Sequence, residues 1–123
     1  MKMDSKEVLI EGVKVIFQIM ANQEHKKMLA DMKMEENPEA GTTHNIAVTL
    51  VDEKSHKEVT NAEISMKVID PAEKSQVKTL KADTMMKYYN AYFNLSQKGK
   101  YQLLIVFKIG DKKSNAGIYY EMK

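Results

Sequence analysis

Residues 101–109 read Tyr-Gln-Leu-Leu-Ile-Val-Phe-Lys-Ile and form the most apolar stretch of the chain. Alternate residues from Tyr101 to Ile109 share one face of an extended strand, whereas Leu104 and Val106 point to the other face. A strand that is apolar on both faces is usually central in its sheet. The stretch therefore predicts a core strand of a β-protein, with a neighbouring strand on each side.

Six further stretches are short, carry alternating apolar residues and are bounded by turn signals such as Ser-Gln-Lys-Gly at 96–99. Turn signals at short intervals are typical of an antiparallel β-sandwich. We therefore predict an all-β fold, an antiparallel sandwich of seven strands. The six further strands are expected at residues 13–20, 43–51, 62–69, 77–80, 88–95 and 116–122.

One segment departs from this pattern. Residues 22–34 have a helical period, which predicts one short helix inserted between the first two strands, with Asn22 as its N-cap. The proline- and glycine-containing run at 36–41 ends the helix. Residues 1–7 are charged, and we expect them to be disordered. A chain of 123 residues is long enough for one core, so we predict a single domain over 1–123.

Composition excludes several classes of function. Nineteen lysines, with no arginine, are interspersed with seventeen acidic residues, which argues against a nucleic-acid surface. The absence of cysteine excludes disulfides, thiolate metal sites and cysteine nucleophiles. No apolar run reaches the roughly 18 residues that a membrane span needs. Gly-rich phosphate loops, His-Glu-x-x-His and Gly-x-Ser-x-Gly are all missing, so we do not expect an enzyme.

The predicted helix has an apolar face that also contains reactive side chains. At about 100° per residue, His25, Met28 and Met32 fall within roughly one third of the helix circumference. Leu29 lies in the middle of this stripe. An amphipathic helix that packs on a sheet has this pattern, because methionine fills irregular gaps in a core. Packing alone is therefore one explanation of the stripe.

A metal site is the other explanation. Thioether sulfur and imidazole nitrogen suit a soft cation such as Cu(I). His44 begins the strand that follows the helix and would complete the set, or else it is a hydrogen-bonded residue at the rim of the core. The candidate ligands are His25, Met28, Met32 and His44, with Met34 or the pair Met85 and Met86 as alternatives for the last place.

The tyrosines have two expected roles. Tyr101 follows Gly99 and is similar to a tyrosine corner, in which the hydroxyl ties the start of a strand to nearby backbone. Alternation places Tyr88, Tyr92 and Tyr119 on outward faces, where we expect an exposed aromatic patch. Such a patch is suited to contact with a protein partner.

Three motifs resemble those of a known group of domains. They are Thr-His-Asn-Ile-Ala-Val-Thr-Leu-Val-Asp at 43–52, Val-Thr-Asn-Ala-Glu-Ile at 59–64 and Lys-Gly-Lys-Tyr-Gln-Leu at 98–103. The segment 43–122 that contains them is similar to the periplasmic immunoglobulin-like sandwiches of the YtkA-like, FixH-like and CopC-like groups. The resemblance implies an immunoglobulin-like sandwich and a periplasmic or otherwise extracytoplasmic location.

Several members of these groups are associated with copper handling or with the assembly of respiratory oxidases. This chain lacks their N-terminal histidine and a His/Asp cluster, so the resemblance does not extend to a Cu(II) site of that type. We predict a non-enzymatic extracytoplasmic module that acts through contacts with an unidentified protein partner, with a weak homodimer as an alternative to the monomer. The alternative function is a Cu(I)-binding or copper-handling protein that uses methionine and histidine ligands.

Overall fold

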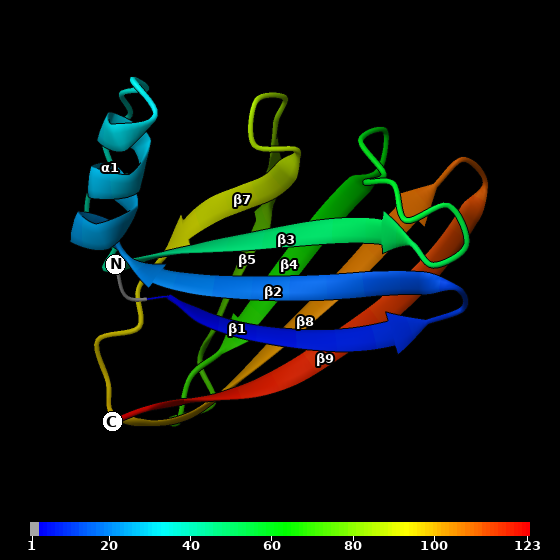
Figure 1. The fold of residues 1–123 in the computed structure, drawn as a ribbon. Coiled ribbons are helices and arrows are strands. Elements are labelled where there is room, and N and C mark those ends of the chain that lie inside the picture. Colours follow the sequence, from blue (N-terminus) through cyan, green and yellow to red (C-terminus); the bar gives the residue numbers. More distant parts are fainter. Residues whose placement is uncertain (1–2) are drawn as a thin grey trace.

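The computed structural model describes residues 3–123, which form nine strands and one helix (Figure 1). In chain order these elements are β1 (Asp4–Ile10), β2 (Val13–Ala21), α1 (Asn22–Asp31), β3 (His44–Asp52), β4 (Glu63–Ile69), β5 (Ser75–Thr79), β6 (Lys81–Asp83), β7 (Tyr88–Phe93), β8 (Gly99–Ile109) and β9 (Lys112–Met122). Within residues 3–123, α1 lacks the length and apolar character that crossing a membrane requires.

The strands form two antiparallel sheets that face each other. The first sheet has the order β1-β2-β3-β7-β6, and the second has the order β5-β4-β8-β9. This arrangement confirms the predicted all-β sandwich with one helix. The stretch at 101–109 lies in β8, which has β4 on one side and β9 on the other, as its two apolar faces indicated.

The core lies between the two sheets and is built from the inward rows of the strands. In β3 the inward row is Ile46, Val48 and Leu50, each fully buried, which is the row that period-two alternation predicted. The matching inward residues of the other strands are Val15, Phe17, Ile19, Ile64, Met66, Val68, Tyr89, Phe93, Tyr101, Leu103, Ile105, Phe107, Ala116 and Ile118. One continuous cluster therefore joins both sheets.

The strand count of seven was wrong, because β1 and β6 were not predicted. β1 opens with Asp-Ser-Lys-Glu, which resembles a charged tail, but charged residues are also common on edge strands. Glu11 and Gly12 join β1 to β2 with positive φ angles of 48° and 81°, as a type I′ hairpin turn requires. The expected disorder at residues 1–7 is therefore wrong for residues 4–7, and residues 1–2 lie outside the described part. β6 has three residues, too few to show a period.

The position of the helix was also predicted incorrectly. Because β1 precedes β2, α1 lies between the second and third strands and not between the first two. It ends at Asp31 instead of continuing to residue 34, and Lys33 adopts a left-handed φ of 59° just beyond it. The N-cap is Ala21, and no side chain caps this end of the helix. The side-chain NH₂ of Asn22 donates to the carbonyl and hydroxyl oxygens of Thr42, at 3.1 Å each.

The predicted tyrosine corner is present at the start of β8. The Tyr101 hydroxyl donates to the carbonyl oxygen of Gln97 at 2.8 Å and accepts from the Gln97 backbone N–H at 3.0 Å. Tyr101 is 1% exposed, so these two hydrogen bonds give its buried hydroxyl the partners that it would otherwise lack.

Candidate functional site

Helix α1 lies on the outer face of the first sheet, the face that points away from the core. It contacts β2 and β3 near the point where β2 runs into the helix (Figure 1). In the register of this sheet, Met20 of β2 is opposite Asn45 of β3, and Asn45 is opposite Tyr92 of β7. All three side chains are buried, although they lie outside the sandwich core. The helix therefore creates a second, smaller interior.

His25 is the central polar residue of this second interior. It lies in the first half of α1 and is 2% exposed. Its Nε2 is 3.0 Å from the Tyr88 hydroxyl, and its Nδ1 is 3.3 Å from the Tyr92 hydroxyl. The Tyr92 hydroxyl also donates to Glu36 Oε2 at 3.1 Å, from the segment that follows the helix. The imidazole is thus held between two tyrosines of β7, one of which is tied to a carboxylate.

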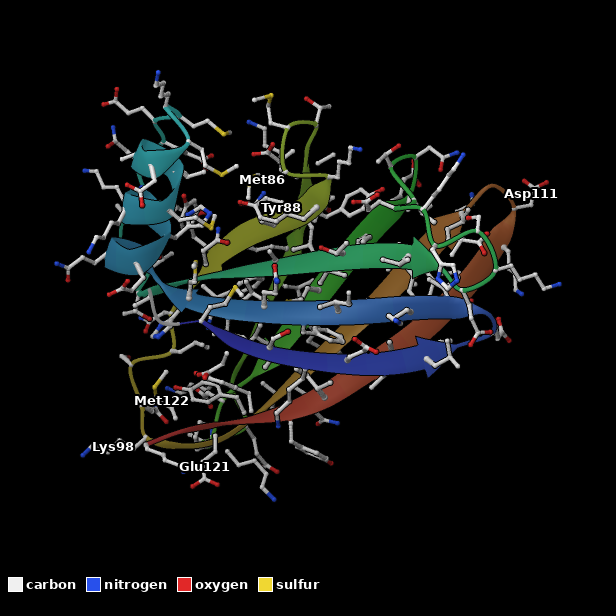
Figure 2. All side chains as sticks on the ribbon, viewed as in Figure 1. Met86, Tyr88, Lys98, Asp111, Glu121 and Met122 are labelled. Carbon is white, nitrogen blue, oxygen red and sulfur yellow. The ribbon has the colours of Figure 1, made fainter. Side chains whose placement is uncertain are left out.

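A cavity of about 160 Å³ adjoins this cluster. Four methionines from four different parts of the chain line it, together with His25 and Tyr88. They are Met3 before β1, Met20 in β2, Met28 in α1 and Met86 before β7. Met86 and Tyr88 lie close together near the start of β7 (Figure 2). We call this space, lined by Met3, Met20, His25, Met28, Met86 and Tyr88, the methionine cavity; Gln18, Asn45 and Ala47 complete its wall.

Burial governs the electrostatics of the cluster. Desolvation lowers the pKa of His25, and the nearby carboxylates of Glu36 and Asp83 offset this only in part. The same desolvation raises the pKa of Tyr88 and of Tyr92 well above the usual value for a phenol. At neutral pH the methionine cavity is therefore lined by a neutral imidazole, the neutral phenol of Tyr88, thioethers and the amides of Gln18 and Asn45.

Acid should destabilise the fold through His25. Its pKa in the folded protein lies below the ordinary value of 6.5, so the unfolded chain takes up the proton first as the pH falls through 6.5. Stability is retained above that pH and lost below it, by at most about 1.4 kcal/mol per pH unit for one group. Urea unfolding at pH 7.5 and pH 5.0 should show a smaller loss for His25→Gln than for wild type, and equal losses would contradict this assignment.

The structure brings together only two of the four predicted ligands. His25 and Met28 line the methionine cavity. Met32 lies at the C-cap of α1, is 48% exposed and does not line that cavity. His44 lies at the start of β3 and lines a different cavity, between the edge strands β1 and β9 of the two sheets.

The surroundings of His44 are polar. Its Nδ1 is 2.7 Å from the Thr43 hydroxyl. Desolvation lowers its pKa, and the carboxylate of Asp4 acts in the opposite direction. Asp4 also accepts a hydrogen bond from the Tyr120 hydroxyl at 2.6 Å, which links β1 to β9. His44 thus belongs to the seam between the two sheets, as the alternative role at the rim of the core suggested.

The expected patch of exposed tyrosines is not formed. Tyr88 and Tyr92 do point away from the sandwich core, but α1 covers them, and they are 5% and 8% exposed. Tyr119 on β9 remains exposed. The alternation was interpreted correctly and the covering helix was not foreseen, because periodicity within one strand does not report what packs on its outer face.

Sequence reasoning did not find Met3 or Met20, and it offered Met86 only as an alternative. The available signal was the alternation in β2, where Gln18 and Met20 share the face opposite Phe17 and Ile19. An outward methionine next to a helix whose own stripe contains methionine indicates that the two apolar faces meet. Within residues 3–123, no group of three or more His, Cys, Asp or Glu side chains is placed to hold a metal ion, and the cavity beside His25 offers thioethers together with the side-chain oxygens of Gln18, Asn45 and Tyr88.

The chain matches no protein-family model. A search of curated proteins also gave no match. Solved structures do resemble it. Uropathogenic Escherichia coli FetP, expressed recombinantly in the periplasm, has a TM-score of 0.74 at 8% identity, covering 98% of this chain and 96% of FetP. A copper-bound FetP variant has the same TM-score and identity and covers 98% of this chain and 97% of its own.

A DUF4426 family protein from Pseudomonas aeruginosa is similar over 96% of this chain and 94% of its own, with a TM-score of 0.66 at 12% identity. At such identities the likeness shows the fold alone. It supports the sandwich architecture that the sequence resemblance implied, along nearly the whole length of the chain.

Proposed function

We propose that this chain is a non-enzymatic, extracytoplasmic copper-binding protein that holds Cu(I) in the methionine cavity. One observation carries the proposal: a buried imidazole and four methionines, brought from four parts of the chain, line a single small cavity. Thioether and imidazole groups are the donors that Cu(I) prefers when thiolate is absent. His25 and a subset of Met3, Met20, Met28 and Met86 would be the ligands.

The charge of the site favours a monovalent ion. The donors are neutral, and His25 and Met20 among them are buried, whereas Met3 is 43% exposed. Removing water from an ion in such a site costs more as the charge of the ion rises. Ca²⁺ and Mg²⁺ sites use carboxylates, whereas the oxygens that line this cavity belong to the neutral side chains of Gln18, Asn45 and Tyr88. Zinc sites normally include thiolate, several imidazoles or carboxylates. Among common biological cations, Cu(I) fits this donor set best.

The order of the strands and the solved structures of similar fold support an immunoglobulin-like assignment. The run β2-β3-β7-β6 facing β4-β8-β9 has the order of the A-B-E-D and C-F-G sheets of an immunoglobulin-like domain. We therefore assign the chain to an immunoglobulin-like sandwich related to the YtkA-like, FixH-like and CopC-like groups. The copper-bound structure of similar fold is a variant of FetP, and FetP was expressed recombinantly in the periplasm, which agrees with a copper-related role outside the cytoplasm.

Removing thioether donors from the methionine cavity should weaken Cu(I) binding. Met20→Leu/Met28→Leu replaces two sulfurs with carbon at nearly constant side-chain volume, so packing is largely kept. We expect the affinity to fall at least about tenfold, the lower end of the loss seen when even a supporting residue of a metal site is changed. The measurement is competition with a Cu(I) chelator under anaerobic conditions.

Met32→Leu is the matched control, because Met32 is the C-cap residue of α1 but is exposed and outside the cavity. It should bind Cu(I) like wild type. Equal affinities for wild type and the double variant would reject the copper site, as would an effect confined to Met32→Leu.

That rejection would leave the other candidate, a module that acts through contacts with a protein partner. The outer face of the second sheet supports it, since an apolar groove of about 570 Å³ crosses β5, β4, β8 and β9 there. Val77 and Val106 on this face are 66% and 36% exposed. The Cu(I) competition therefore distinguishes the two functions.

A further inference from the structure

We propose that Tyr92 and Glu36 are positioning residues that lock His25 in the tautomer with its proton on Nδ1, so that Nε2 turns its lone pair toward the methionine cavity. The inference deepens the proposed copper site, and its metal-binding half rests on that proposed function. The tautomer itself is a property of the metal-free protein. Neither Tyr92 nor Glu36 lines the methionine cavity.

Glu36 determines which group donates and which accepts in the hydrogen bonds around His25. An ionised carboxylate accepts hydrogen bonds and cannot donate them. The Tyr92 hydroxyl, 3.1 Å from Glu36 Oε2, therefore donates its one proton to that carboxylate. Its remaining contact, with His25 Nδ1 at 3.3 Å, must be one in which Tyr92 accepts. Nδ1 consequently carries the imidazole proton.

The rest follows from the single proton of a neutral imidazole. With the proton on Nδ1, Nε2 is an acceptor, and the Tyr88 hydroxyl donates to it at 3.0 Å. Tyr88 lines the methionine cavity and Tyr92 does not, so Nε2 lies on the cavity side of the ring. A soft cation in the cavity would replace the Tyr88 proton as the partner of this lone pair.

This arrangement has a general counterpart in metal sites. A histidine that binds a metal through one ring nitrogen usually donates the other N–H to an oxygen, which fixes the tautomer and the ring orientation. Here Tyr92 supplies that oxygen from β7, and Glu36 orients the hydroxyl from the segment after α1. The two rings also pack edge to face, nearly perpendicular at 76° with their centroids 5.7 Å apart, which restricts the orientation of the imidazole against Tyr92.

Two matched substitutions on either side of the same ring test the lock. Tyr92→Phe removes the acceptor of the Nδ1 proton, so the proton should move to Nε2, where Tyr88 can accept it. Tyr88→Phe removes only the donor to Nε2, so the proton should stay on Nδ1. The tautomer is read from the ¹⁵N chemical shifts and two-bond couplings of His25 in the metal-free protein. Wild type should show a protonated Nδ1 and a bare Nε2.

Cu(I) competition on the same three proteins supplies the second measurement. Tyr92→Phe should weaken binding by about 10- to 100-fold, the usual effect of losing such a supporting residue. Tyr88→Phe should strengthen binding, because it removes the hydroxyl that competes for Nε2. A purely structural role would make both variants weaker. A wild-type tautomer with its proton on Nε2, or unchanged tautomers in Tyr92→Phe, would overturn the inference whether or not copper binds. Failure of the wild type to bind Cu(I), with the expected tautomers, would instead reject the proposed function and the metal-binding half while leaving the tautomer lock standing.

Discussion

Replacing Phe93 with alanine should lower the free energy of unfolding by about 3–5 kcal/mol, the usual cost of deleting a buried aromatic ring. Phe93 is fully buried in the inward row of β7, and the Lys78 ammonium lies 5.2 Å from its ring centroid. The same strand carries Tyr88 and Tyr92 on its outer face. A cavity under Phe93 would therefore disturb both the core and the support of the candidate copper site.

Chemical denaturation with guanidinium gives the measurement, and Tyr119→Ala is the control. Tyr119 is an aromatic residue of comparable size but is 57% exposed, with Lys100 5.2 Å from its ring centroid. Its removal should cost about 1 kcal/mol or less. Similar losses for the two variants would mean that the described core does not carry the stability of the fold.

His25→Leu should have the largest effect on copper binding. It deletes the imidazole, which is the only nitrogen among the proposed ligands, so we expect Cu(I) affinity to fall at least about 100-fold, the upper end of the loss for a residue that only supports a ligand. It also removes the acceptor of the Tyr88 hydroxyl, whereas the Tyr92 hydroxyl still has Glu36 as its acceptor. Leaving one buried hydroxyl without a partner should cost about 1–3 kcal/mol of stability.

His44→Gln distinguishes the two histidines that the sequence singled out. His44 lines another cavity, so this variant should bind Cu(I) with wild-type affinity in the same competition experiment. The unfolding free energy of each variant, measured separately, shows whether a lost affinity reflects unfolding. If His44→Gln loses affinity while His25→Leu does not, the copper ion is bound in the seam between the sheets and the methionine cavity is not its site.

Much of the fold was predictable from sequence because each strand has its own period and its own turn. Ile46, Val48 and Leu50 could be assigned to the core from alternation alone, and they are fully buried. β1 was missed because the sandwich uses a charged segment as an edge, where pairing with β2 supplies the stability that the side chains do not. Pairing is a property of two segments, and one segment does not reveal it.

Less of the candidate site was predictable. The stripe on α1 correctly placed His25 and Met28 toward the sheet, since helical geometry fixes their direction. Met32 was predicted on the same stripe, but the helix ends at Asp31. Helical periodicity therefore no longer determines the direction of the Met32 side chain. Met20 and Met3 join the site through the register of β1, β2 and β3, which no local pattern contains.

The topology also determines when the site is assembled during folding. β8 and β9 form a hairpin of eleven residue pairs around a two-residue turn, so little chain entropy is lost when they meet. β3 pairs with β7 although β4, β5 and β6 lie between them in the chain, and α1 separates β2 from β3. Contacts between distant segments form slowly. We therefore expect the hairpins β1-β2 and β8-β9 to form before long-range pairs such as β3-β7 and β4-β8, and His25 to meet its two tyrosines late in folding.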